Sequence, residues 1–186
     1  MQGDLLALLY LNPDHEYSLS EAARQCRTSV KTLHPEVNRL SKAGLIDERR
    51  LGNLRMLRAG DPGPIRQPLT QLLAATYGPI PVLERELATV KGIERTYIYG
   101  SWAARHGGVE GPPPNDVDVL AVGTVDRDEV LQAAERAQDD LRREVNVAVV
   151  TVDSWSNPDG DPFLQSVQGS HLVELDLRDE AKGPRS

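Results

Sequence analysis

The stretch YGSWAARHGGVEGPPPNDVDVLAVG, residues 99–123, decides how the second half of the chain folds. Gly100 and Ser101 follow an apolar segment, and the glycine allows the backbone to turn tightly and to approach a bound group. Asp116 and Asp118 stand two residues apart in front of another apolar segment, so their side chains point the same way on a strand. Two carboxylates on one face of a strand can hold Mg²⁺. The stretch therefore predicts a strand, a Gly-Ser turn, a short helix and a strand that begins with paired acids.

The same alternation of strands and helices continues on both sides of this stretch. The expected elements are strands at 93–100, 116–123, 145–152 and 171–177 and helices at 101–107, 126–144 and 161–170. Strands that alternate with helices indicate an α/β layer. We therefore expect residues 93–186 to form one domain, a mixed sheet with flanking helices.

This order of strand, Gly-Ser, helix and Asp-x-Asp strand resembles the minimal nucleotidyltransferases of the DNA polymerase beta superfamily. The resemblance implies that Gly100 and Ser101 bind a nucleoside triphosphate. It also implies that Asp116 and Asp118 are catalytic and hold Mg²⁺. The reaction of that family transfers a nucleoside monophosphate to an acceptor and releases pyrophosphate.

The resemblance covers roughly residues 93–176 and departs from the family at one position. The family's third carboxylate lies on a neighbouring strand, where the matching residue here is Asn146. An amide offers an oxygen ligand but no basicity. Glu144 faces the same way and is a partial substitute near the start of the strand. Whether the chain is a Mg²⁺-dependent nucleotidyltransferase or binds a nucleotide through Asn146 without turnover stays open.

Upstream of residue 60 the pattern is helical and ends in a hairpin. DLLALLYL (4–11) predicts a buried helix, and Ser18 with Glu21 forms a capping box for a second one. A third helix is expected from about 30 to 43, because its apolar residues recur at helical spacing. Two strands around Gly52 and Asn53 predict a hairpin with a primed turn.

The charge of the chain is unevenly distributed. The net charge is −7, but residues 24–58 contain nine basic and three acidic residues. A basic patch on an acidic protein indicates contact with nucleic acid. One cysteine, the lack of a signal peptide and the lack of a long apolar run predict a cytoplasmic protein with no membrane contact.

Helices followed by a basic hairpin resemble the winged helix-turn-helix domain of ArsR-type bacterial regulators, over residues 1–60. The resemblance implies that the third helix lies in the major groove of double-stranded DNA and that the hairpin reaches the backbone or a minor groove. The residues expected to contact DNA are Ser29, Lys31, Thr32, His34, Asn38, Arg39, Arg49, Arg50, Asn53 and Arg55. Pro35 disturbs this helix, which must either kink there or begin near it.

The expected fold class is α+β with two domains. Residues 1–60 form an N-terminal winged helix-turn-helix, 61–92 are linking helices, and 93–186 form a C-terminal nucleotidyltransferase-like α/β domain. The favoured function is a DNA-binding transcriptional regulator, expected as a homodimer, whose second domain senses a Mg²⁺-bound nucleoside triphosphate. The alternative is an active nucleotidyltransferase that modifies a small molecule, protein or RNA within a toxin–antitoxin pair and regulates its own operon. A module for protein interaction is the third hypothesis.

Overall fold

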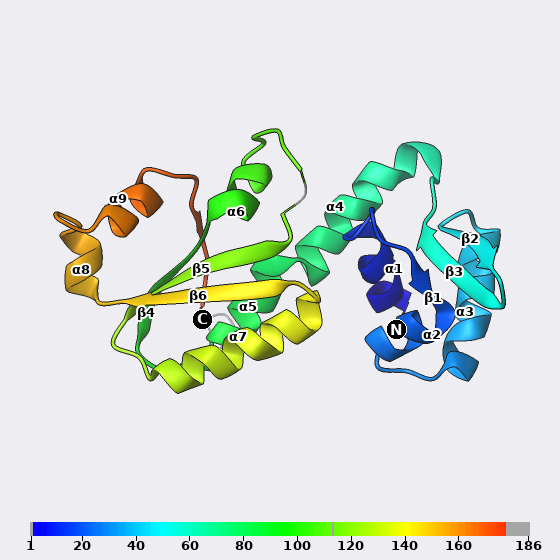
Figure 1. Cartoon of the computed structure of the whole chain (residues 1–186), viewed down its shortest axis with the longest axis horizontal. Coiled ribbons are helices and arrows are strands. Elements are labelled where there is room, and N and C mark those ends of the chain that lie inside the picture. The colour runs from blue at the N-terminus through cyan, green and yellow to red at the C-terminus, as the bar shows by residue number, and fades with distance from the viewer. Residues whose placement is uncertain (1, 113, 178–186) are drawn as a thin grey trace, which may run out of the picture. The chain divides into compact units, whose positions relative to one another are not determined.

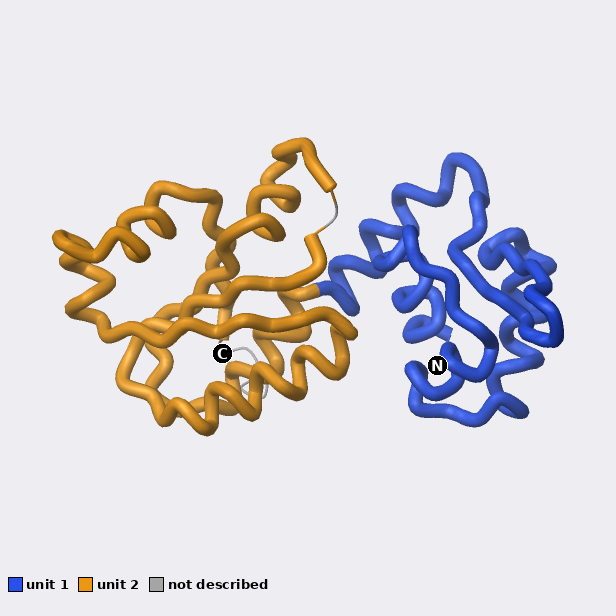
Figure 2. The backbone as a smooth tube through the Cα atoms, viewed as in Figure 1, with its two compact units in different colours: residues 1–78 blue, residues 79–186 orange. Residues whose placement is uncertain are grey.

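The computed structural model describes residues 2–112 and 114–177, and the chain divides into two compact units, residues 1–78 and 79–186 (Figure 2). The segment 61–92, expected to link two domains, is divided between the units. Its first helix belongs to the first unit and its second helix to the second unit. Gly78, the last residue of the first unit, caps the first of these helices.

The first unit consists of helices and one small sheet (Figure 1). Its elements in chain order are α1 (Gln2–Tyr10), β1 (Tyr17–Ser18), α2 (Leu19–Gln25), α3 (Val30–Lys42), β2 (Ile46–Leu51), β3 (Leu54–Ala59), η1 (Gly63–Ile65) and α4 (Arg66–Tyr77). The sheet is antiparallel with the order β1-β3-β2. The short strand β1 was not expected, because two residues are too few to show a period.

The core of the first unit lies between α1 and α3. Leu5 and Leu8 of α1 are buried in one cluster with Leu33 and Val37 of α3. Helix α4 packs on α1 and contributes Leu73 to the same cluster. The predicted buried first helix and the helical spacing of the third are therefore confirmed.

Capping side chains set where α2 and α3 begin. The Ser18 hydroxyl accepts from the backbone N–H of Glu21, and the Glu21 carboxylate accepts from that of Ser18, so the predicted capping box is formed. Ser29 caps α3, which begins at Val30 and continues through Pro35. Of the two alternatives for Pro35, the one in which the helix begins near Pro35 is wrong. The helix begins more than one turn earlier, where the Ser29 hydroxyl accepts from the backbone N–H of Thr32.

The hairpin β2–β3 has the predicted two-residue turn. Ile46 pairs with Ala59 at its base and Leu51 with Leu54 at its tip. Gly52 has a φ of +59°. A positive φ at the first central residue is what a type II′ turn requires, so glycine is favoured there.

The second unit is built on a mixed sheet. Its elements are α5 (Pro79–Leu87), β4 (Ile93–Tyr99), α6 (Gly100–His106), β5 (Asp116–Gly123), α7 (Arg127–Leu141), β6 (Glu144–Val150), α8 (Val152–Ser156), α9 (Pro162–Gln168) and β7 (Val173–Glu174). The strand order is β6-β5-β4-β7. Strands β5 and β6 are parallel, and β4 is antiparallel to both β5 and β7.

The two faces of this sheet have separate cores. Val117 and Val119 of β5 pack in a cluster with α5 and α7 (Figure 1). Leu120 and Val122 pack in a second cluster with Leu164 of α9. Because side chains alternate along a strand, Asp116 and Asp118 share the face of Leu120 and Val122.

Several elements of the second unit differ from those expected. The helix expected to reach residue 144 ends at Leu141, because Arg142 takes a left-handed conformation, and Glu144 begins β6. The strand expected to reach residue 152 ends at Val150, because the Thr151 hydroxyl accepts from the N–H of Ser154 and starts α8. The last strand shrinks to Val173–Glu174, which pairs with only two residues of β4. In the part of the chain that the structure describes, no helix is both long and apolar enough to span a bilayer.

Candidate functional site

The start of α3 presents one cation and one imidazole to solvent. The hydroxyls of Ser29 and Thr32 are engaged in capping the helix. The Ser29 Oγ accepts from the Thr32 N–H at 3.1 Å, and the two hydroxyl oxygens lie 2.8 Å apart. Lys31 is exposed and has neither a hydrogen bond nor an ion pair within residues 2–112 and 114–177. His34 is exposed one turn further on, with its Nδ1 3.4 Å from Asn38 Nδ2.

Arg55 joins the hairpin to α3. Its Nη2 donates to Asn38 Oδ1 of α3 at 2.6 Å, and its Nε donates to Glu48 Oε2 of β2 at 2.5 Å. The Arg55 side chain is 19% exposed. The hydrogen bond from Arg55 holds the pKa of Glu48 below its ordinary value. The polar atoms of Asn38 and Arg55 are thus engaged with each other, and we refer to Arg55, Glu48 and Asn38 as the Arg55 junction.

Two other arginines of this surface form exposed ion pairs. Arg39 binds Glu36 at 2.5 Å, and Arg49 binds Glu16. The arginine side chains are 60% and 54% exposed. Exposed pairs contribute about 0–1 kcal/mol. A phosphate can therefore replace the carboxylate at little cost in stability.

Arg50 lies on the side of the hairpin that faces α3. It pairs directly with Arg55 across the strands. Residues opposite each other in an antiparallel pair project to the same face, and the Arg55 junction shows that this face meets α3. Arg50 is exposed and has no hydrogen bond or ion pair in the described part of the chain.

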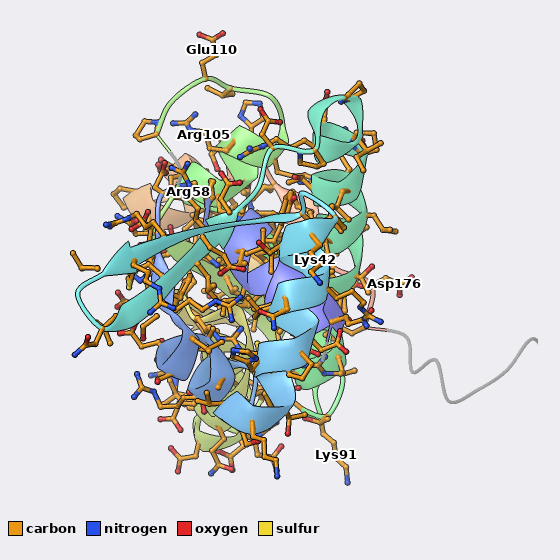
Figure 3. All side chains as sticks on the ribbon, turned by 90° about the vertical axis from the view of Figure 1, so that its right-hand side faces the viewer. Lys42, Arg58, Lys91, Arg105, Glu110 and Asp176 are labelled. Carbon is orange, nitrogen blue, oxygen red and sulfur yellow. The ribbon has the colours of Figure 1, made fainter. Side chains whose placement is uncertain are left out.

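Two further polar side chains extend this basic surface. Asn53 is exposed in the hairpin turn. Lys42, labelled in Figure 3, is exposed on the last turn of α3. The sequence-predicted DNA residues therefore gather on α3 and the hairpin, but only some of their side chains are available for a ligand.

The second candidate site lies on the sheet of the second unit, where β5 and β6 run side by side. The acid pair, Asp116 and Asp118, lies opposite Glu144 and Asn146 of β6. Asn146 Nδ2 donates to Asp116 Oδ2 and to Asp118 Oδ1, both at 3.3 Å. The structure therefore brings together the two acids and the amide that the sequence placed at the third-carboxylate position.

Asp118 has an unusual electrostatic environment. Partial burial raises the pKa of its carboxyl, and the charges of Asp116 and Glu144 add to that rise. The hydrogen bond from Asn146 acts in the opposite direction. Repulsion among close carboxylates is relieved by a cation, so this arrangement favours binding of a positive charge.

Gly100 packs directly on the acid pair. Its φ is +70°, and a Cβ at this position would overlap the Asp118 Oδ2 atom. The positive φ therefore favours glycine, and any larger residue would displace the Asp118 carboxylate. Ser101, the next residue and the second of α6, is exposed. The structure thus places Gly100 beside Asp118, whereas binding of a triphosphate by Gly100 and Ser101 stays a prediction.

Tyr99 is a neighbour of this site that sequence reasoning did not single out. It pairs with Asp118 across β4 and β5. Burial and the Asp118 charge raise the pKa of its hydroxyl. Its ring contacts Phe163 of α9 edge to face, with centroids 5.9 Å apart. Its position beside Gly100 in the sequence was the signal that could have identified it.

Arg105 holds the loop between α6 and β5. Its Nη1 donates to the Val109 carbonyl at 2.7 Å and its Nε to the Pro112 carbonyl at 3.3 Å. Figure 3 labels Arg105 and, on this loop, Glu110. The sequence did not indicate that Arg105 would bind the carbonyl groups of this loop. Part of the GPPP run lies outside the described residues.

The acid pair offers oxygen ligands of the type that Mg²⁺ binds, but only a small number of them. Carboxylate and amide oxygens are hard ligands of the type that Mg²⁺ takes, and it usually keeps several waters besides. Within the described ranges, no group of three or more His, Cys, Asp or Glu side chains is placed to hold a metal. Asp116 and Asp118 are thus the residues that would hold Mg²⁺, since Asn146 turns its amide nitrogen toward them.

Comparisons with known proteins give little further information. No protein-family model matches the chain, and no curated protein matches it. Among solved structures, reduced HlyU from Vibrio cholerae N16961 matches with 20% identity and a TM-score of 0.34, over 40% of this chain and 76% of HlyU. A TM-score of that size does not establish a shared fold.

Proposed function

We propose that the first unit is a winged helix-turn-helix that binds double-stranded DNA, and that the chain is a transcriptional regulator. The observation that carries this proposal is the common face of α3 and the hairpin. Lys31 and His34 are exposed at the start of α3, and Arg50 projects from the hairpin toward the same side. Such a face fits a major groove with its adjacent backbone.

The contacts have different roles in this proposal. Lys31 and His34 meet base edges, because the first residues of a recognition helix enter the groove. Arg50 contacts phosphate, and Arg39 and Arg49 exchange their carboxylate partners for phosphates. The Arg55 junction positions the hairpin and makes no base contact.

The first test is selection of duplexes from a random-sequence DNA pool by the full-length chain. We expect enrichment of a defined sequence by the wild type and its loss in the variant Lys31→Ala/Arg50→Ala. The control Lys91→Ala/Arg127→Ala removes the same charge at exposed cations of the second unit. Equal enrichment by both variants would contradict the assignment of α3 and the hairpin.

A second candidate function is binding of a Mg²⁺-bound nucleoside triphosphate by the second unit. The observation that favours it is the gathering of Gly100, Asp116, Asp118 and Asn146 at one place. Mg²⁺ would supply positive charge for the phosphates, and the acid pair would orient it. Gly100 would leave the space beside Asp118 free.

We assign this site to binding without transfer. Asn146 cannot accept a proton from an attacking hydroxyl, because an amide has no basicity in this range. The bound nucleotide would then act as an effector of the regulator. The alternative of an active transferase requires that Asp116, Asp118 or Glu144 takes that proton.

Calorimetric titration with the four nucleoside triphosphates, with and without Mg²⁺, tests this second function. We expect Mg²⁺-dependent binding of one nucleotide, its loss in Asp118→Ala, and no change in the control Asp139→Ala on α7. Pyrophosphate release in the presence of an acceptor would support the transferase alternative. No binding of any nucleotide would rule out both.

A further inference from the structure

The acid pair shares its face of the sheet with several aromatic side chains. The chain has two tryptophans, five tyrosines and one phenylalanine. Tyr99 lies opposite Asp118, so its ring projects to the face of the acid pair, and Tyr97 points the same way two residues earlier. Four of the eight aromatic residues gather on this face: Tyr97 and Tyr99 of β4, Trp155 of α8 and Phe163 of α9.

Phe163 is the most exposed of these four residues. Tyr97 is buried, and Trp155 packs on it with ring centroids 5.1 Å apart. Phe163 is 44% exposed, and its contact with Tyr99 is edge to face. Such a contact covers at most one face of a ring, so Tyr99 leaves the other face of the Phe163 ring uncovered. Within the described residues, the Phe163 ring has no aromatic neighbour besides Tyr99.

Helix α9 holds the Phe163 ring in place. The Asp161 carboxylate accepts from the backbone N–H groups of Phe163 and Leu164 and so sets the start of the helix. Leu164 is buried in the cluster on this face of the sheet. At the other end of α9, Gln168 Nε2 donates to the Trp155 carbonyl of α8 at 2.6 Å. A ring on an anchored helix loses little freedom when it binds a ligand, so it suits a flat apolar group.

The separation of Phe163 from the acid pair selects the ligand. Tyr99 stands between them: it pairs with Asp118, and opposite residues of an antiparallel pair have Cα atoms about 4.5–5.5 Å apart. The rings of Tyr99 and Phe163 have centroids 5.9 Å apart. These two steps are comparable in length to the ribose and linking atoms that separate the phosphates of a nucleotide from its base. A nucleotide whose phosphates are held through a cation at the acid pair would therefore bring its base to Phe163.

We propose that the Phe163 ring stacks on the base of the bound nucleotide and that this base is a purine. This inference rests on the nucleotide binding proposed above, which assigns residues to the phosphates and the metal but none to the base. Every base has a π-face that stacks on an aromatic side chain. A purine has two fused rings, so it covers more of the phenyl ring than a pyrimidine does and buries more apolar surface. The ligand class is therefore a purine nucleoside triphosphate.

The experiment is a calorimetric titration of the full-length chain with five ligands in the presence of Mg²⁺: ATP, GTP, CTP, UTP and inorganic tripolyphosphate, which has phosphates but no base. Phe163→Ala removes the ring, Phe163→Leu keeps an apolar side chain without a π-face, and Phe163→Tyr keeps the ring. The matched control is Leu131→Ala, because Leu131 of α7 in the same unit is 53% exposed. The Asp161 cap binds the backbone of Phe163, so these substitutions leave the start of α9 intact, which thermal melting checks.

We expect the wild type to bind ATP or GTP about tenfold more tightly than CTP, UTP or tripolyphosphate, because stacking adds to the binding of the phosphates. Phe163→Ala and Phe163→Leu should lose this advantage and still bind tripolyphosphate as the wild type does. Phe163→Tyr should keep most of the advantage, and Leu131→Ala should behave as the wild type.

The opposite outcomes separate this inference from the function on which it rests. Equal binding of ATP and GTP by the wild type and Phe163→Ala would overturn the stacking role while nucleotide binding stands. CTP or UTP bound as tightly as the purine nucleotides would overturn the choice of a purine. A change of oligomeric state in Phe163→Ala, measured by light scattering, with unchanged nucleotide affinity would make the ring a contact between copies and overturn the inference. If the wild type binds neither tripolyphosphate nor any nucleotide, the nucleotide function itself fails.

Discussion

We expect Asp118 to lower the stability of the second unit at neutral pH. Its pKa is raised in the folded chain by burial and by Asp116. The folded state therefore holds the proton more tightly than the unfolded state, so the destabilisation is fully present above the folded pKa. It disappears as the pH falls below the unfolded value of about 3.9.

The variant Asp118→Asn should therefore raise the free energy of unfolding at pH 7, with a gain that shrinks as the pH falls. Urea denaturation across the acid range measures this. Asp139→Asn on α7 removes the same formal charge from an exposed position and serves as the control. A loss of stability in Asp118→Asn at neutral pH would show that the carboxylate stabilises its surroundings.

Substitutions at Gly100 and Gly160 separate the effect of backbone strain from the effect of a steric overlap. Gly100→Ala and Gly160→Ala both place alanine at a positive φ, +70° and +86°. Each should cost about 1–2 kcal/mol for the left-handed conformation. Only Gly100→Ala also overlaps Asp118, whereas Gly160 has open space around it. We expect nucleotide titration to show loss of binding in Gly100→Ala alone; equal binding in the two variants would remove Gly100 from the site.

The sequence predicts the orientation and contacts of some residues but not of others. The shared direction of Asp116 and Asp118 follows from the two-residue period of a strand, and the structure agrees. The Arg55 junction was not predictable, because its contacts depend on which residue of α3 meets the hairpin. The contacts of Arg105 are equally a matter of loop conformation, which carries no periodic signal.

At the scale of elements, the hairpin and α3 act together only if the Arg55 junction holds. Arg55→Ala removes the hydrogen bonds to Asn38 and Glu48. We expect the affinity for selected DNA to fall several-fold with little change in salt slope, because Arg55 contacts no phosphate. Arg55→Lys should restore part of the affinity. Anisotropy titrations across a salt series measure both quantities.

Arg58→Ala is the matched control on the same strand. Arg58 pairs with Asp47 at 3.2 Å and its side chain is 58% exposed (Figure 3). It should leave the affinity close to that of the wild type. A fall in salt slope in Arg55→Ala, of the size caused by loss of one phosphate contact, would instead make Arg55 a direct DNA contact.

Element boundaries were predictable where a cap or a turn residue sets them. Ser18 and Gly52 mark local hydrogen bonds or dihedral angles that a sequence encodes within a few residues. Strand β1 was missed because its pairing partner lies about forty residues away in β3. Helix α8 was missed because threonine is a residue type that favours strands. Here the Thr151 hydroxyl caps a helix instead.

At the scale of the whole molecule, a nucleotide-sensing regulator requires that the two units affect each other's binding. Saturating nucleotide with Mg²⁺ should change the affinity for selected DNA by about 5-fold or more. Asp116→Ala should abolish this change without altering DNA binding in the absence of nucleotide. DNA affinity that does not respond to nucleotide in the wild type would contradict the sensor role and leave two independent binding units.

The organisation into two units was expected from the sequence, because the charge and the periodicity both change between the halves. The basic surface lies wholly in the first unit and the acid pair in the second. Dimer formation stays a prediction, which light scattering measures directly. The helices at 61–92 illustrate the limit of sequence reasoning, since membership of a unit depends on packing partners far along the chain.

The most direct test of DNA binding by the first unit is an anisotropy titration of the wild type on duplex DNA over a salt series. The account predicts an affinity that falls steeply with salt. In Lys31→Ala/Arg50→Ala the affinity should fall and the log–log slope should be shallower by about 1, because Arg50 meets a phosphate whereas Lys31 meets a base edge. Absence of binding at low salt, or a slope and affinity unchanged by the two substitutions, would contradict it.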